Sequence, residues 1–157
     1  MNEVWQDKIP PQDIEAEQAV LGAIFLDSDT LIDAMEIVTP RSFYRRSHQI
    51  IFQSMIQLSN RGEAIDLVTL KAEIEKSNAL EDIGGISYLS ELSQSTPSSA
   101  SVSYYAKIVD DKSLLRQLIQ TANQIVVKSF EQGEEVMIEQ VRINDVFMGS
   151  FSCDIRT

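Results

Sequence analysis

The sequence predicts an all-α protein in which a small helical globular domain is followed by a projecting helical hairpin. Apolar residues recur at the three- and four-residue spacing of helices, and no strand-like alternation of convincing length appears. Capping residues, prolines and glycines fall between the periodic segments. Hydrophobic residues make up 43% and charged residues 24% of the 157 residues. This composition is typical of a folded domain and argues against disorder.

The first helix is expected over residues 13–27. Asp13 is a typical N-cap, and acidic residues follow it in the first turn, where the helix dipole favours negative charge. A second, short helix is expected over residues 29–37. Pro40 then starts a further turn, because proline is favoured at the first helical position.

A longer helix is expected through residue 60, with Ser47 as its cap. It carries too many apolar residues for a lightly covered surface helix, so it should be central to the core. The next helix is expected over residues 67–77. Asp66, followed three residues later by Thr69, is its predicted cap.

The last helix of the globular domain is expected over residues 85–93, entered through two glycines. The chain then becomes rich in serine, which is the clearest change of composition along the sequence. We therefore expect a globular subdomain over residues 1–95 and a Ser-rich joint over residues 96–103.

Residues 101–132 contain neither proline nor glycine and predict one long helix of roughly 48 Å. Such a helix is too long for a compact globule of this chain and should project from it. A second helix folding back after it would complete a helical hairpin over residues 104–148. The spacing of a helix-packing seam is found at Leu115, Leu118, Ala122 and Ile125.

The chain is acidic, with 13 basic and 24 acidic residues and a formal charge of −11. This charge repels the phosphate backbone, so no direct nucleic-acid binding is expected and a protein partner is favoured. The single cysteine, Cys153, fits a reducing compartment. No signal peptide or apolar segment long enough to span a membrane is evident, so we expect a cytoplasmic protein without membrane contact.

The usual catalytic motifs are missing from the sequence. No glycine is followed by lysine, so the phosphate-binding P-loop cannot occur. His48 is the only histidine, which excludes paired-histidine metal sites and favours a packing or hydrogen-bonding role for this side chain. We therefore expect no catalytic residues and no metal site, and no enzyme activity from this chain alone.

One basic cluster interleaves with aromatic residues. It comprises Arg41, Phe43, Tyr44, Arg45, Arg46 and His48. The cluster, together with Arg61, could bind single-stranded nucleic acid. The favoured interpretation is that the basic groups balance nearby acids while both aromatic residues lie in the core. Tyr88 is either a core residue with its hydroxyl at the surface or an exposed anchor for a partner.

Five segments carry a family resemblance. They are IPPQDIEAEQAVLGAIFLD (9–27), FYRRSHQIIF (43–52), GEAIDLVTL (62–70), LEDIGGISYLSEL (80–92) and YYAKIVDDKSLLRQLI (104–119). In this order and spacing, the chain resembles the N-terminal domain of DnaB-family bacterial replicative helicases over about residues 8–136. The remaining tail, residues 149–157, does not match the family. The resemblance implies a helical globule followed by a helical hairpin.

The resemblance also implies a function in DNA replication. Full-length members are ATP-driven hexameric helicases that move 5′ to 3′, and ATP and magnesium belong to a separate motor domain that this sequence lacks. No cofactor is therefore expected here. The N-terminal domain pairs through its hairpins into a collar, a trimer of dimers, and docks the C-terminal domain of the DnaG-type primase. A helicase loader is a further candidate partner.

The family pattern assigns roles to individual positions of this chain. The primase contacts would be Tyr88, Ile119 and Ile125, with Glu15 as a polar contact. Hairpin packing or pairing would fall to Leu115, Leu118 and Ala122. For each aliphatic residue, a place in the core of the hairpin remains the alternative. An alternative function for the whole chain is a stand-alone helicase-like fragment that regulates a helicase ring.

Overall fold

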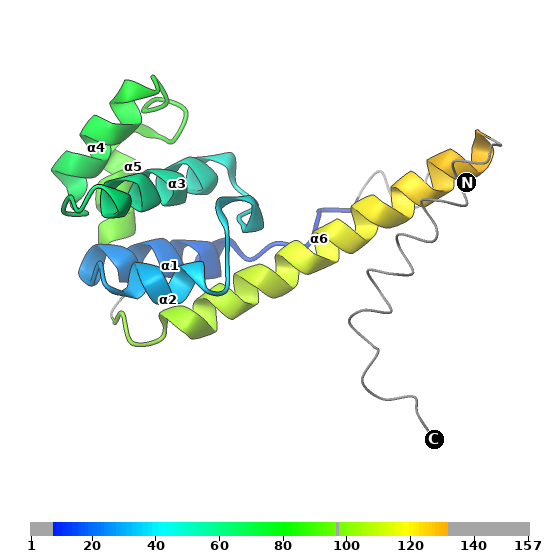
Figure 1. The fold of residues 1–157 in the computed structure, drawn as a ribbon, viewed down its shortest axis with the longest axis horizontal. Helices are drawn as coiled ribbons and strands as arrows, with labels where there is room; N and C mark the ends of the chain where they lie inside the picture. Colours follow the sequence, from blue (N-terminus) through cyan, green and yellow to red (C-terminus); the bar gives the residue numbers. More distant parts are fainter. Residues whose placement is uncertain (1–7, 97, 132–157) are drawn as a thin grey trace. The chain divides into compact units, whose positions relative to one another are not determined.

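The computed structural model describes residues 8–96 and 98–131, and this part of the chain is helical without any strand (Figure 1). The elements are α1 (Ile14–Leu26), α2 (Thr30–Met35), the 3-10 helix η1 (Pro40–Ser42), α3 (Arg46–Asn60), α4 (Leu67–Lys76), α5 (Gly85–Ser93) and α6 (Val102–Phe130). The all-α prediction is confirmed, and each helix predicted within the described residues has a counterpart. The predicted return arm of the hairpin and the tail lie outside the described residues.

Local signals in the sequence set most of the helix boundaries. The carboxylate of Asp13 accepts a hydrogen bond from the backbone N–H of Ala16 at 2.9 Å and so caps α1. Asp66 caps α4 by accepting from the N–H groups of Val68 and Thr69 at 2.8 and 2.9 Å. These bonds satisfy N–H groups that have no partner within their own helix.

The predicted cap of α3 was wrong. Ser47 lies within the first turn of α3, and the N-cap is Arg45, which makes no hydrogen bond through its side chain to the helix end. The backbone N–H groups of Tyr44 and Arg45 instead donate to the carboxylate of Glu17 on α1. A distant carboxylate therefore secures the chain that enters α3, which no local capping pattern could reveal.

The first compact unit, residues 1–115, has its core around α1. This helix packs against α2, α3 and α5, while α3 also packs against η1 and α4 (Figure 1). Phe43 and Phe52 are the largest buried side chains, with ring centroids 4.9 Å apart. The first turns of α6 complete this core with Val102, Ala106 and Val109.

The second unit comprises residues 116–157, and the boundary between the units falls within α6. Of its described residues, several large apolar side chains of α6 are exposed: Ile119, Val126, Val127 and Phe130. The prediction that residues 96–103 form a joint between two domains stays a prediction. Among the described residues, no helix has the length and apolar character needed to cross a membrane.

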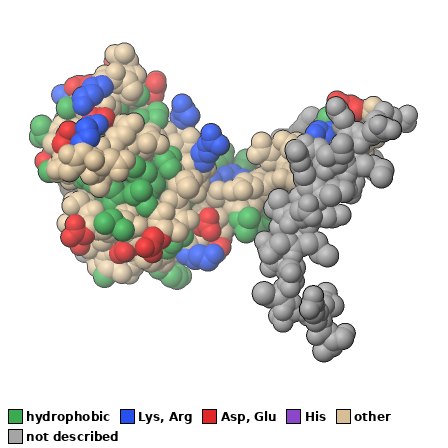
Figure 2. Space-filling view, viewed as in Figure 1, with side chains coloured by type: hydrophobic (Ala, Val, Ile, Leu, Met, Phe, Trp, Pro, Cys, Tyr) green, Lys and Arg blue, Asp and Glu red, His purple; other side chains and the backbone are tan. Residues whose placement is uncertain are grey.

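Acidic side chains lie along one edge of the first unit, where Figure 2 shows them over α2. The exposed acidic residues of this region are Asp27, Asp29, Asp33 and Glu36. They account for part of the negative charge expected from the sequence, and none of them has an ion pair among the described residues.

Candidate functional site

A chain of hydrogen bonds links α1, α3 and α5 through Glu17, His48 and Tyr88. Nδ1 of His48 lies 2.5 Å from Oε2 of Glu17, and Nε2 of His48 lies 2.6 Å from the hydroxyl oxygen of Tyr88. His48 and Glu17 are almost completely buried, with 0% and 1% of their surface exposed. The predicted hydrogen-bonding role of His48 is therefore confirmed.

The donors and acceptors of this chain can be assigned from their chemistry. The carboxylate of Glu17 only accepts, so Nδ1 of His48 donates to it. When Nδ1 carries the only ring proton, Nε2 accepts the hydroxyl proton of Tyr88. The same hydroxyl oxygen accepts from Nε2 of Gln18 at 3.2 Å. In this arrangement every member has a partner, as a buried polar network requires.

The hydroxyl of Tyr88 is therefore turned inward, so the first of its two alternatives, a core residue with its hydroxyl at the surface, does not describe it. The ring of Tyr88 is nearly parallel to that of His48, at an interplanar angle of 8° and a centroid distance of 5.9 Å. Tyr88 is only half-buried. It lines an open pocket of about 480 Å³, together with Arg45, Ser47, Glu81, Asp82, Ile83, Gly84, Ser87 and Glu91.

Gly84 allows the backbone to lie close to the side chain of Tyr88. Its φ of 97° is in the left-handed region, which favours glycine. A Cβ atom at this position would stand 3.1 Å from Cβ of Tyr88, which is tighter than ordinary van der Waals contact. Gly84 is thus the N-cap residue of α5 and avoids the steric clash with Tyr88 that a side chain at this position would cause.

Glu15 is the second predicted primase contact in the first unit. It is exposed on α1, three residues before Gln18, whose side chain bonds the hydroxyl of Tyr88. Residues three apart share one face of a helix, so Glu15 lies on the face of α1 that meets Tyr88. The structure therefore brings two of the predicted site residues to one side of the first unit.

The other predicted site residues are on α6. Leu115 and Ile119 are 44% and 40% exposed, which leaves both available for contacts. Leu118 and Ile125 are half-buried, and Ala122 is exposed. At about 100° per residue, these five positions fall within about 120° of the helix circumference and so form one side of it.

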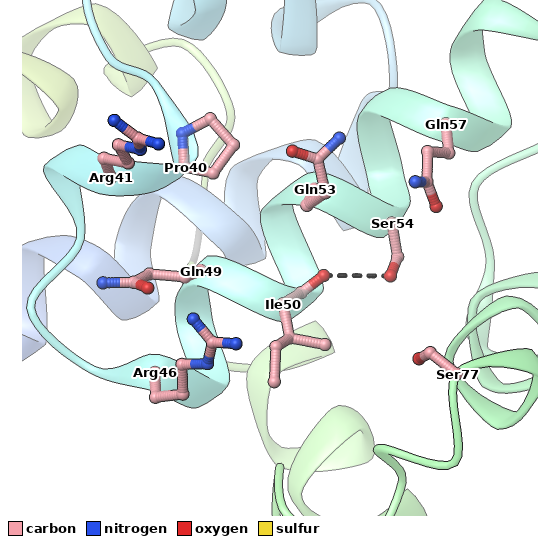
Figure 3. Close-up of a pocket in the computed structure, with 9 residues that line it drawn as sticks. All are labelled: Pro40, Arg41, Arg46, Gln49, Ile50, Gln53, Ser54, Gln57 and Ser77. Carbon is pink, nitrogen blue, oxygen red and sulfur yellow. Dashed lines mark hydrogen bonds between the residues drawn. The ribbon is translucent and has the colours of Figure 1, made fainter.

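The predicted basic cluster is divided by the fold. Arg41 and Arg46 line a shallow groove of about 310 Å³ over α3 (Figure 3), whereas Arg45 lines the pocket beside Tyr88. Among the described residues, none of these three arginines makes an ion pair with a carboxylate. Arg45 nevertheless lines its pocket together with Glu81, Asp82 and Glu91, so the balancing of charge by nearby acids stays a prediction for these arginines. Arg61, in contrast, pairs with Glu63 and Glu73.

The two aromatic residues of the cluster also differ. Phe43 is buried in the core, as predicted, and its ring contacts that of Phe52. Tyr44 is 37% exposed, so its predicted core position was wrong. The two residues are adjacent in sequence: the backbone of Phe43 is extended, and the chain bends at Tyr44 before α3 begins.

Sequence reasoning missed Glu17 and Gln18 as members of the site. A signal for Glu17 was present, because it precedes Leu21 by four residues and Ile24 by seven, and so shares their buried face. A carboxylate on an apolar face needs a buried partner. The sequence gives no means to identify that partner as His48, 31 residues away.

No group of three or more His, Cys, Asp or Glu side chains that could hold a metal ion is present in residues 8–96 and 98–131. The fold and the site define a small all-α domain that presents a half-buried tyrosine beside an open pocket. The chain belongs to the DnaB-like helicase N terminal domain family, whose model matches residues 9–111.

Curated relatives and solved structures agree with this family. The chain is 52% identical over 136 residues to the replicative DNA helicase DnaB of Geobacillus stearothermophilus, covering 87% of the chain and 30% of the relative. It thus spans about a third of the length of this relative. The N-terminal domain of DnaB helicase from Mycobacterium tuberculosis is 40% identical with a TM-score of 0.81, covering 87% of this chain and 99% of that structure.

A longer solved structure is also similar. It is a DnaB-like replicative helicase described together with its interactions with primase, at 26% identity and a TM-score of 0.69. The match covers 84% of this chain and 31% of that structure. The chain therefore corresponds to the N-terminal domain of proteins that are replicative DNA helicases.

Proposed function

We propose that this domain is the docking and assembly module of a bacterial replicative DNA helicase. It docks the C-terminal domain of a DnaG-type primase and pairs with other copies through its helical hairpin, as a dimer and as a trimer of dimers in the hexamer. The use of ATP and magnesium for unwinding DNA belongs to the motor domain of the longer protein. Holding primase at the helicase raises its local concentration on the unwound strand.

The observation that carries the docking proposal is the presentation of Tyr88. Its side chain lines an open pocket of about 480 Å³, and its hydroxyl is hydrogen-bonded to the side chains of His48 and Gln18. Tyrosine is enriched among the residues that dominate protein interfaces, and a ring already held in place loses little freedom on binding. Glu15, on the same side of α1, adds a polar contact.

The aliphatic residues of α6 supply the rest of the proposed surfaces. Ile119 and Ile125 are the proposed primase contacts, and Leu115, Leu118 and Ala122 the proposed pairing residues. Exposed apolar side chains along one helix favour contact with another protein, because they gain free energy when they leave water. A helicase loader is a further proposed partner, for which we assign no residues.

The docking proposal is tested by calorimetric titration of the 157-residue chain with the isolated C-terminal domain of a DnaG-type primase. Ile119→Asn should weaken binding by about tenfold or more, as expected for loss of an apolar anchor. Gln120→Asn is the matched control, because it places the same side chain at the neighbouring exposed position of α6. This control should bind as the wild type does.

Circular dichroism of each variant separates docking from folding. Because Ile119 is exposed, Ile119→Asn should retain the helical spectrum and the melting temperature. Wild-type affinity in this variant would remove Ile119 from the docking surface, and unfolding of the variant would instead assign it to the core of the hairpin. Lack of any binding by the wild-type chain would refute the docking proposal itself.

A further inference from the structure

We propose that His48 and Glu17 are positioning residues for partner docking, and that the partner recognises Tyr88 through its ring while the hydroxyl serves only to hold that ring in place. This inference rests on the proposed docking at Tyr88. It adds a role for two buried residues that a partner cannot touch.

The argument begins with the direction of the Tyr88 hydroxyl. Nε2 of His48 lies 2.6 Å from the hydroxyl oxygen and Nε2 of Gln18 lies 3.2 Å from it. The hydroxyl thus gives its proton to one internal partner and accepts from another. A partner that approaches through the open pocket meets the ring, since the usual bonds of a phenolic hydroxyl are already made.

The second step concerns the rigidity of His48. Its Nδ1–H is bonded to Glu17, which fixes both the tautomer and the plane of the imidazole. The carboxylate of Glu17, on α1, itself accepts a hydrogen bond from the backbone N–H of Tyr44, just before α3. The position of the Tyr88 ring is therefore determined by a chain of bonds anchored in two other helices.

The third step is that little else fixes this ring on its open side. Gly84 contributes no side chain beside it, and Ser87 and Glu91, which also line the pocket, are exposed. Tyr88 packs against the hydrophobic core on its inner side, and the bonds to His48 and Gln18 are the hydrogen bonds that fix the outer end of its side chain. Loss of the bond to His48 should free the ring to adopt other orientations, and docking would then have to select one of them.

The test uses two substitutions of His48 that remove different bonds. In His48→Asn, the amide can still donate to Glu17 from near the position of Nδ1 but does not reach Tyr88. In His48→Gln, the longer side chain places an oxygen near the position of Nε2, where it can accept from Tyr88. We expect His48→Asn to weaken primase binding by about three- to tenfold and His48→Gln to weaken it less.

Tyr88→Phe removes the hydroxyl and keeps the ring, so it should weaken binding by about the same factor as His48→Asn. The double variant should bind no worse than Tyr88→Phe alone, because removal of the hydroxyl has already broken the bond between Tyr88 and His48. In a Tyr88→Ala background, which should weaken binding by about thirtyfold or more, His48→Asn should have no further effect.

A purely structural role of His48 predicts a different pattern. Its loss would then weaken binding equally with and without Tyr88, or would leave binding unchanged while lowering stability. Either result would overturn the positioning role. Ile74→Val serves as the control, because it removes one buried methylene from α4 and lowers stability without touching the hydrogen-bonded chain. This control should bind primase as the wild type does.

A measurement on the free chain separates the inference from the docking proposal. In NMR spectra of tyrosine-labelled protein, the ring signals of Tyr88, assigned from Tyr88→Phe, should shift more in His48→Asn than in His48→Gln and stay unchanged in Ile74→Val. Both substitutions of His48 remove the ring current of the stacked imidazole, and only His48→Asn also removes the bond to Tyr88. Equal ring signals in the two His48 variants would overturn the positioning role. If instead the signals differ while Tyr88→Ala binds primase at full affinity, the positioning of the ring stands and docking at Tyr88 fails.

Discussion

Arg61 is joined to Glu73 by two hydrogen bonds, from Nη2 to Oε2 at 2.6 Å and from Nη1 to Oε1 at 3.1 Å. This paired geometry ties the end of α3 to α4 across their connecting loop. Nζ of Lys76 also donates to Oε2 of Glu73, at 2.6 Å. The bonds from Arg61 and then Lys76 lower the pKa of Glu73 from an ordinary value of 4.5 to about 2.

The first prediction concerns acid stability. Because the pKa of Glu73 is lower in the folded chain, its carboxylate stabilises the fold fully above about pH 4.5, and this contribution is lost as the pH falls toward 2. Glu73→Gln should lower the melting temperature at neutral pH and flatten its decline over this acidic range. Melting curves followed by circular dichroism across the range check this.

Glu36→Gln is the matched control for this experiment, because Glu36 is exposed and has no ion pair among the described residues. Its melting temperature should follow that of the wild type at every pH. If Glu73→Gln declined in parallel with the wild type over the acidic range, the contribution of the pair with Arg61 would be excluded.

The second prediction concerns the cap of α4. Asp66 accepts hydrogen bonds from the N–H groups of Thr69 and Val68, and the first of these contributes most to lowering the pKa of Asp66. Asp66→Ala should cost about 1 kcal/mol in the free energy of unfolding, measured with urea. Asp66→Asn should recover most of this loss, since asparagine also accepts from the helix end. Equal stability of the alanine and asparagine variants would count against the capping role.

The third prediction concerns the contact of Gly22 on α1 with the end of α5. A Cβ atom at Gly22 would lie 2.5 Å from Oγ of Ser95 and 2.9 Å from the carbonyl oxygen of Leu92. The hydroxyl can rotate away, whereas the backbone carbonyl cannot. Gly22→Ala should therefore destabilise the chain by about 1–3 kcal/mol, although this change inside a helix usually stabilises.

A second variant tests this explanation of the Gly22 contact. Adding Ser95→Ala to Gly22→Ala removes the nearest atom and should restore only part of the stability, because the Leu92 carbonyl remains. Urea unfolding of the single and double variants measures both effects. A gain in stability on Gly22→Ala would show that α1 and α5 can separate without cost.

These contacts show which parts of the structure the sequence could predict. The cap at Asp66 and the turn at Gly84 were predicted correctly, because each depends on residues a few positions apart. The bonds from Glu17 to His48 and from His48 to Tyr88 join residues 31 and 40 positions apart. No local pattern encodes such pairings, since the packing of whole helices decides which side chains meet.

The same reason explains the errors at the start of α3. Ser47 is a good capping residue by type. The carboxylate of Glu17 on α1 instead accepts hydrogen bonds from the backbone N–H groups of Tyr44 and Arg45, just before α3. The exposure of Tyr44 follows from this arrangement, because its backbone faces inward toward Glu17 while Phe43 fills the core. Composition alone could not distinguish the two aromatic neighbours.

The last prediction concerns pairing through α6. Leu115 is 44% exposed, so its side chain contributes little to the core of the first unit and is available to a second copy. If it belongs to the proposed pairing surface, Leu115→Asn should raise the dissociation constant of self-association by about tenfold or more. Light scattering over a range of concentrations measures this. Leu114→Asn makes the same change at an exposed neighbour about 100° around the helix, and should have the smaller effect. Equal weakening by both variants would favour general loss of apolar surface over a defined pairing face.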